Sequence, residues 1–299
     1  MDNIFYDLEQ FGISNISKFN HNIFEEELYK AEYPPGANPD QVMKENIRVL
    51  HSRHEEFLFI KPKSRVAPGD PYFYIKEFKC PVCAAKFKVD TLKETKVKLE
   101  AMEYDLRPVY RTMDPLFYEI LTCESCGYSA SKKNFDRITA PQKERILAVI
   151  SPTFHFIPIP KEPSVDEVIA RFKLALYNAI VKSSGPGERA YLCMKLTWLY
   201  RIQGDLEKEK RFAALAKEGF TLSLSKEVPP VMEMQESVIL YVLAANSLLL
   251  GDADYAVRLL SELALKKIPK SLKDRVDLLK FDALECKKTG EPFVPVQGL

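Results

Sequence analysis

The sequence predicts an α+β protein that is mainly α-helical. Two observations lead to this prediction. Residues 73–139 hold two Cys-x-x-Cys motifs and short stretches in which apolar residues crowd or alternate, as is typical of β-strands. From Pro141 to Lys288 the apolar residues recur about every 3.6 positions, which is the period of amphipathic helices. We therefore expect a small β module followed by a stack of helices.

Breaks in composition divide the 299-residue chain into four parts. We expect a variable N-terminal arm, a metal-binding module, a helical domain and a flexible tail, at residues 1–72, 73–139, 140–290 and 291–299. Within the arm, an amphipathic segment is expected at Phe24–Ala31 and an extended piece at Phe57–Ile60. The helical domain should contain helices at residues 141–150, 165–183, 188–203, 205–225, 233–250, 253–266 and 271–288.

Four cysteines predict a structural metal site: Cys80, Cys83, Cys123 and Cys126. Each two-residue gap lets one tight turn present both sulfurs to the same ion, and two such turns complete a tetrahedron. Gly127 suits the left-handed turn that such a knuckle needs. Strands before and after each knuckle give the layout of a zinc ribbon. The 39 residues between the two motifs exceed the ~15–20 of the common pattern, so an insertion must project from the module.

The four thiolates of the predicted site favour some metals over others. Four thiolates favour structural Zn²⁺ and leave no position for a catalytic water. An iron site of the rubredoxin type, which would make the protein an electron carrier, is an alternative, because Cys126-Gly127-Tyr128 resembles a rubredoxin knuckle. A redox dithiol is a further alternative, although no thioredoxin-like strand-helix-strand pattern surrounds either motif. Cys193 and Cys286 lie in helical apolar patterns and are expected to be buried, inert thiols.

Composition points to a cytoplasmic protein without a membrane span. The first residues show neither the basic nor the apolar region of a secretory signal. No apolar run reaches the ~18 residues that a membrane span needs. Lys and Arg total 43 against 42 Asp and Glu, so no global field draws the protein to nucleic acid or lipid.

Nucleic-acid binding remains an alternative because zinc ribbons often bind nucleic acid. Residues 73–140 carry twelve Lys/Arg and ten Asp/Glu, a small surplus for contacts with phosphates. Arg107, Tyr110 and Arg111 form the one basic and aromatic group of the insertion. The competing interpretation is an ion-paired loop over the metal site, because Asp105 and Asp114 are close in sequence.

No catalytic motif is recognisable. The chain has no glycine-rich phosphate loop, no GxSxG elbow and no HExxH motif. His51 and His54 are spaced HxxH beside acidic residues, which indicates a solvated helix end more than half a metal site. The sequence therefore predicts a protein that is not an enzyme.

The turns between the predicted helices resemble those of tetratricopeptide repeats. Gly204-Asp205-Leu206-Glu207-Lys208 and Gly251-Asp252-Ala253-Asp254-Tyr255-Ala256 begin second helices in the same way. Ala256 and Leu260 match the small and bulky positions of such a helix. Glu209 departs from the pattern, because a small residue is expected there. The resemblance implies tetratricopeptide-like helical hairpins with long helices; another kind of helical bundle is the alternative.

Stacked hairpins commonly bind a partner on the surface lined by their first helices. Here these are the predicted helices at 188–203 and 233–250. Lys195, Arg201 and Asn246 lie on them and are the candidate partner-binding residues. The alternative is a solvated cationic face and a core asparagine. The sequence thus predicts a scaffold that binds a protein, with neither the partner nor the oligomeric state specified.

Taken together, the chain resembles a bacterial family catalogued as a domain of unknown function (number 2225). The matching segments are Cys80–Phe87, Asp105–Pro108, Asp114–Leu116, Cys123–Ala130, Tyr177–Ile180 and Leu196–Arg201, with Tyr110 and Tyr118. The resemblance extends over residues 73–290. It implies a bacterial cytoplasmic protein with a double knuckle followed by helices, and it implies no particular reaction.

Overall fold

The protein is described here from a computed structural model. The described residues are 4–13, 23–24, 38–58, 66–67 and 69–295. The expected amphipathic segment lies outside them, except for Phe24. Of the expected extended piece, Phe57 and Leu58 are helical instead, because they continue α1 (Pro39–Leu58), and the other two residues are outside the described part.

Two compact units make up the chain. The first consists of residues 1–96 and 115–184, and the second of residues 97–114 and 185–299. The division differs from the boundaries expected at 73, 140 and 290. The first two helices after the metal module pack with that module, whereas the insertion packs with the later helices. Each unit is described separately below.

Short antiparallel hairpins form the β structure of the first unit. β1 (Phe73–Lys79) pairs with β2 (Lys86–Leu92), and β5 (Ile120–Thr122) pairs with β6 (Ser129–Ser131). Each hairpin encloses one Cys-x-x-Cys motif in its turn. One-turn helices, η3 (Glu94–Lys96) and η4 (Pro115–Tyr118), stand at the two ends of the insertion. The predicted strand, knuckle, strand order is therefore present.

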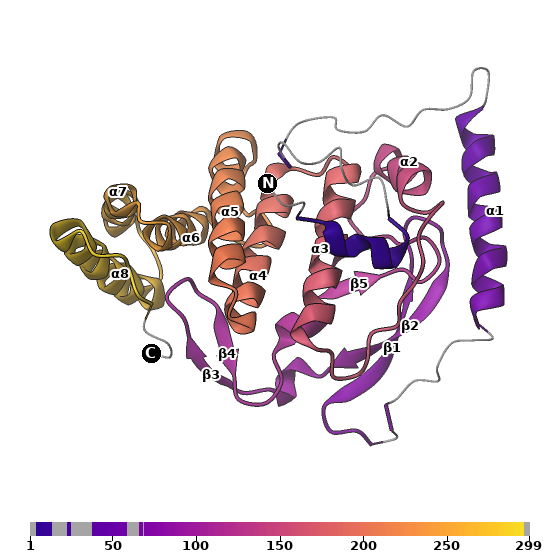
Figure 1. Ribbon diagram of the computed structural model, residues 1–299, viewed down its shortest axis with the longest axis horizontal. Coiled ribbons are helices and arrows are strands. Elements are labelled where there is room, and N and C mark those ends of the chain that lie inside the picture. The colour runs from indigo at the N-terminus through magenta and orange to yellow at the C-terminus, as the bar shows by residue number, and fades with distance from the viewer. Residues whose placement is uncertain (1–3, 14–22, 25–37, 59–65, 68, 296–299) are drawn as a thin grey trace. The chain divides into compact units, whose positions relative to one another are not determined.

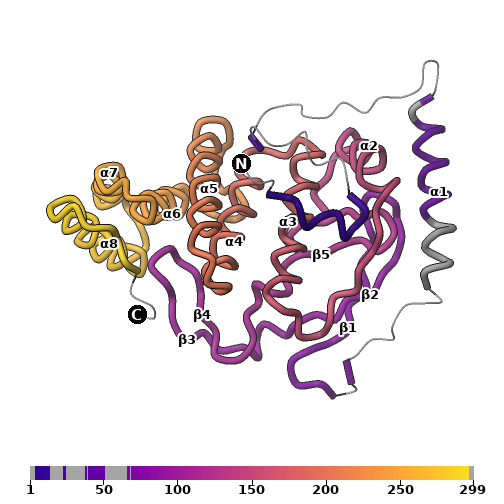
Figure 2. Tube along the Cα trace, in the orientation of Figure 1, coloured from indigo at the N-terminus to yellow at the C-terminus, as the bar shows by residue number. Residues whose placement is uncertain are grey.

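Helix α3 (Val165–Val181) forms the centre of the first unit. It is buried on nearly all sides, and Ser164 caps its start in a capping box with Glu167. α2 (Ala140–Val149) packs against it. Part of the N-terminal arm is also a packed element, because η1 (Tyr6–Phe11) contacts α3, as Figures 1 and 2 show. Asp7 accepts a hydrogen bond of 2.9 Å from the buried Lys173.

The second unit is a stack of helices. Its members are α4 (Pro186–Gln203), α5 (Leu206–Lys226), α6 (Glu236–Leu249), α7 (Ala253–Leu265) and α8 (Lys270–Thr289). Each packs against the next along the chain, and Figure 1 shows this order. The prediction of an α+β protein that is mainly α-helical is confirmed.

The turn between α4 and α5 and the turn between α6 and α7 have the same structure. Gly204 and Gly251 each adopt a left-handed conformation, with φ of +83° and +84°, which ends the preceding helix. The following residues, Asp205 and Asp252, cap the next helix by accepting hydrogen bonds from backbone amides. Ala256 is fully buried in the second hairpin. The similarity of these turns in sequence thus reflects the same capping chemistry.

The insertion forms a hairpin in the second unit. β3 (Leu99–Met102) pairs with β4 (Pro108–Tyr110), with an irregularity between Leu99 and Ala101. Residues 103–107 make the turn, which we call the hairpin tip. Leu106 has a φ of +67°, a conformation that a leucine rarely adopts. Contacts of the tip must therefore hold it in place.

We predict that Gly127→Ala destabilises the protein far more than Gly69→Ala. Both glycines have positive φ, +75° and +81°, which alone costs a side chain about 1–2 kcal/mol. A Cβ at Gly127 would also lie 2.5 Å from Phe154 Cγ, whereas at Gly69 it would meet nothing within 4 Å. Overpacking adds roughly 1–3 kcal/mol. Urea denaturation measures the difference, and equal losses for the two variants would contradict the account.

Candidate metal centre

The first knuckle is a tight turn closed by its own backbone. β1 ends at Lys79, and the amide of Cys80 then donates to the carbonyl of Ala85 over 2.8 Å. The amide of Ala84 donates back to the carbonyl of Cys80 over 2.9 Å. The amide of Val82 lies 3.4 Å from Cys80 Sγ and donates to it. These bonds direct both sulfurs of the motif to the same side.

The second knuckle repeats this geometry. The amide of Cys123 donates to the carbonyl of Tyr128 over 2.8 Å, and that of Gly127 to the carbonyl of Cys123 over 3.1 Å. Gly127 has the positive φ that the sequence predicts for it. Ala84 holds the equivalent place with a φ of +63°. This strained residue could not be predicted from the sequence, because alanine rarely takes that conformation.

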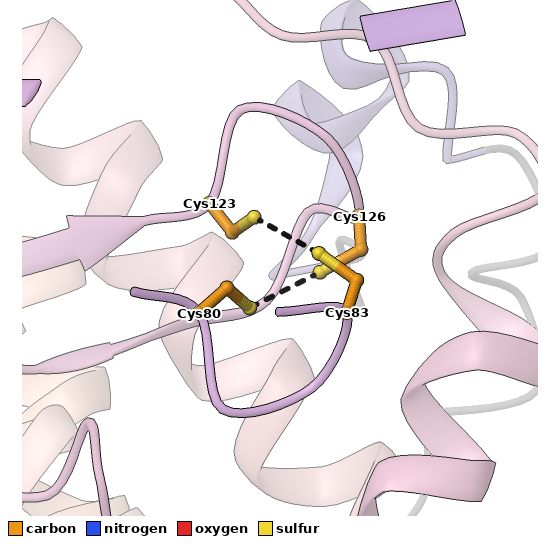
Figure 3. A group of neighbouring side chains, drawn as sticks. All are labelled: Cys80, Cys83, Cys123 and Cys126. Atoms are coloured by element: carbon orange, nitrogen blue, oxygen red, sulfur yellow. Dashed lines mark hydrogen bonds between the residues drawn. The ribbon is translucent and has the colours of Figure 1, made fainter. Parts of the chain in front are cut away.

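The two knuckles bring four sulfurs together, as Figure 3 shows. Cys80 Sγ lies 3.6 Å from Cys126 Sγ, and Cys83 Sγ lies 3.6 Å from Cys123 Sγ. All four sulfurs lie within 4.8 Å of one another, and all four residues are buried. A tetrahedral ion with metal–sulfur bonds of ~2.3 Å would need sulfurs ~3.8 Å apart. The cluster therefore fits one metal ion.

Burial makes two of the four thiols, those of Cys123 and Cys126, poor acids. Desolvation raises the pKa of Cys123 and Cys126 well above the usual value for a thiol. Hydrogen bonds from Cys123, Cys126 and Cys80 lower the pKa of Cys83, so one thiolate is stabilised by the other three groups. A metal ion must replace the remaining protons when it binds.

Side chains of the first unit fix the second knuckle from behind. Asn178, in the last turn of α3, donates from Nδ2 to the carbonyl of Gly127 over 3.2 Å. Its Oδ1 accepts from the amide of Ser129 over 3.2 Å. The hydroxyl of Ser151 donates to the carbonyl of Cys126 over 2.8 Å. The roles of these residues were not predicted from the sequence, although an asparagine within an apolar helical pattern is a detectable signal.

This arrangement can hold a metal ion but offers no open coordination position. Four sulfurs complete a tetrahedron, which suits zinc or iron. In the described part of the chain no other group of three or more His, Cys, Asp or Glu side chains meets the geometry of a metal site. The cluster therefore has the chemistry of a structural centre.

The remaining two cysteines, Cys193 and Cys286, do not belong to this cluster. Cys193 is fully buried, and burial raises the pKa of its thiol well above the usual range. Cys286 is half-buried, and desolvation raises its pKa as well. His51 and His54 lie in α1, but their side chains are outside the described part. Reactive thiols depend on a lowered pKa, so these shifts favour the expected inert thiols. The expected burial holds for Cys193 but not for Cys286, which is half-buried.

Arg201, a candidate partner-binding residue, is already engaged within the second unit. Its guanidinium contacts Glu103, Asp105 and Glu209 at 2.5, 2.7 and 2.6 Å. Burial alone would lower its pKa, but the carboxylate of Asp105 and its neighbours raise it. Glu209, the departure from the repeat pattern, is thus part of a buried ion-pair cluster.

The other two candidates occupy different surroundings. The half-buried Lys195 lies over the rings of Trp198 and Tyr191, at 4.0 and 4.9 Å from their centroids. Asn246 is buried in α6, and its Nδ2 has no hydrogen-bond partner among the described residues. The structure does not gather Lys195, Arg201 and Asn246 into one exposed patch.

The candidate nucleic-acid residues are only partly accessible. Arg107 is buried, and its guanidinium pairs with Glu103 at 2.6 Å and Asp114 at 3.4 Å. Arg111 is exposed and lies 3.7 Å from Glu100, while Tyr110 is half-buried. Arg107 therefore cannot contact a phosphate in this conformation, and the predicted ion pairing of the insertion is present.

Comparison with protein families gives one match. The model described as "Uncharacterized protein conserved in bacteria (DUF2225)" covers residues 73–280. The chain belongs to this bacterial family. The matched range contains both knuckles and the helices from α2 to α7, and it ends within α8. Searches among curated proteins and among solved structures gave no match.

Among the described helices, none combines the length and the apolar character needed to cross a membrane.

We predict one bound metal ion per chain, which is lost when Cys83 or Cys123 is replaced by Ser. Each replacement removes one of four ligands and leaves three buried sulfurs without a complete tetrahedron. Metal analysis by mass spectrometry measures the stoichiometry. Cys286→Ser is the matched control, because it removes a cysteine outside the cluster and should leave the metal in place. Full metal content in Cys123→Ser would contradict the assignment.

Proposed function

We propose that the protein is a non-catalytic scaffold of the bacterial cytoplasm, which binds another protein through its helical stack while structural Zn²⁺ holds the metal module. One observation carries this proposal. Three helices, the first of each hairpin and α8, donate hydrogen bonds to the hairpin tip and to the residue before it. The donors are Trp198 and Arg201 on α4, Tyr241 on α6 and Arg275 on α8. These four residues form what we call the docking face, a surface that accepts a segment of polypeptide.

The helical stack is proposed to be of the tetratricopeptide type. The shared glycine and aspartate chemistry of the α4–α5 and α6–α7 turns supports this proposal. So does the order of packing, in which each helix contacts the next. Proteins of this kind use the first helices of their hairpins to bind partners. Lys195 lies on such a helix, next to Trp198.

Zinc is the proposed metal because the cluster is closed and buried. When bound, zinc would supply folding energy and no reactivity, since Cys80, Cys83, Cys123 and Cys126 fill its coordination sphere. The same four sulfurs also suit a single iron ion. A colourless purified protein with one zinc per chain supports the proposal, and a red protein containing iron contradicts it.

We predict that Lys195→Glu abolishes partner capture from the native bacterial cytoplasm. The full-length protein is immobilised, and captured proteins are identified by mass. Reversing this charge beside the docking face should reduce the specifically captured protein at least tenfold. Lys88→Glu is the matched control, because Lys88 is exposed on β2 in the metal module. If Lys195→Glu retains the same partner as the wild type, the partner does not bind at this face.

A further inference from the structure

The docking face recognises both side chains and backbone of the hairpin tip. Trp198 Nε1 donates to Asp105 over 3.0 Å, and Arg201 donates to both oxygens of the same carboxylate, over 3.1 and 2.7 Å. The hydroxyl of Tyr241 donates to the carbonyl of Tyr104 over 2.7 Å. Arg275 Nη1 lies 3.3 Å from the carbonyls of Met102 and Glu103 and donates to both.

The tip presents an aromatic ring between two carboxylates. The Tyr104 ring lies 4.8 Å from the Arg201 guanidinium, and its centroid is 5.1 Å from that of Phe293. Its hydroxyl accepts from Arg201 over 2.8 Å. Glu103 and Asp105 flank it and contact the same guanidinium. The docking face therefore contacts an acid, an aromatic residue and an acid in succession within a turn.

Without the tip, the positive charge of Arg201 in the docking face would still be paired with a carboxylate of the helices. Arg201 Nε donates to Glu209 over 2.6 Å, and both residues belong to the helices rather than to the tip. With the tip docked, three carboxylates contact the Arg201 guanidinium, and one of them, Glu103, also pairs with Arg107 of the tip. Like charges that share a buried site oppose one another. Glu209 thus keeps Arg201 paired when the tip leaves and weakens the tip when it is bound.

We infer that the docking face is a binding site for an acidic turn of a partner protein, in which an aromatic residue stands between two carboxylates, and that the chain's own tip fills the site until such a partner displaces it. This inference rests on the proposed scaffold function and names its partner's chemistry. The tip competes with an effective concentration on the order of millimolar, because it is tethered to the same chain. A partner must exceed that advantage.

The test uses a fluorescent, backbone-cyclised peptide that carries residues 99–110 of this chain. The full-length protein is compared with Glu103→Gln/Asp105→Asn, in which the tip loses both charges and keeps its shape. The matched control is Glu94→Gln/Glu100→Gln, which removes two exposed charges outside the docking face. The double variant at the tip should bind the peptide at least tenfold more tightly than the wild type and the control. A peptide with Glu103 and Asp105 neutralised should show no such gain.

Trp198 provides an independent readout, because it is the only tryptophan of the chain and is buried. In the tip variant its emission should shift to the red, and addition of the acidic peptide should reverse the shift. Tyr241→Phe, which removes one hydroxyl, should weaken peptide binding in the tip variant several-fold.

Unchanged emission with no gain in peptide binding would overturn the inference and make the tip a fixed strut. Dimers of the tip variant, in which two copies exchange hairpins, would also overturn it, because the occupant would then be a second copy. Neither result would decide the scaffold function, because the capture experiment with Lys195→Glu tests that function separately.

Discussion

Four buried sulfurs within 4.8 Å of one another are the constraint on which the first unit depends. Thiols this close together and away from water can form hydrogen bonds only with one another or with nearby backbone groups. A divalent cation that binds to them replaces their protons. The two knuckles, the strained Ala84, the left-handed Gly127 and the hydrogen bonds of Asn178 all orient groups around that point.

The second unit has a comparable centre at Arg201. A guanidinium that contacts three largely buried carboxylates has strict geometric requirements, and removing one partner of such a pair commonly costs about 3–5 kcal/mol. Two of those carboxylates, on Glu103 and Asp105, belong to the insertion between the two cysteine motifs. The insertion's unusual length is thus explained by its role in the helical unit. The bond from Trp198 to Asp105 places the chain's one indole at the same point.

Much of the architecture could be predicted from the sequence, because local signals determine it. Two Cys-x-x-Cys motifs identify the ligands, and the apolar period with its glycine and aspartate turns gives the helices within a few residues. The packing of the insertion could not be predicted, since the contacts from Arg201 to Glu103 and Asp105 join positions almost a hundred residues apart. Glu209 was visible as a departure from the repeat pattern, but its partner was not. The two units also depend on such long-range contacts, so α2 and α3 could not be assigned to the metal module from periodicity alone.

The closed metal centre is the central claim, because it separates a structural role from a catalytic one. X-ray absorption at the zinc edge of the purified protein tests it most directly. The account predicts four sulfur neighbours at about 2.3 Å and no nitrogen or oxygen ligand. Three sulfurs with one oxygen ligand would contradict it, because that ion would have a water or substrate position and the chemistry of an active site.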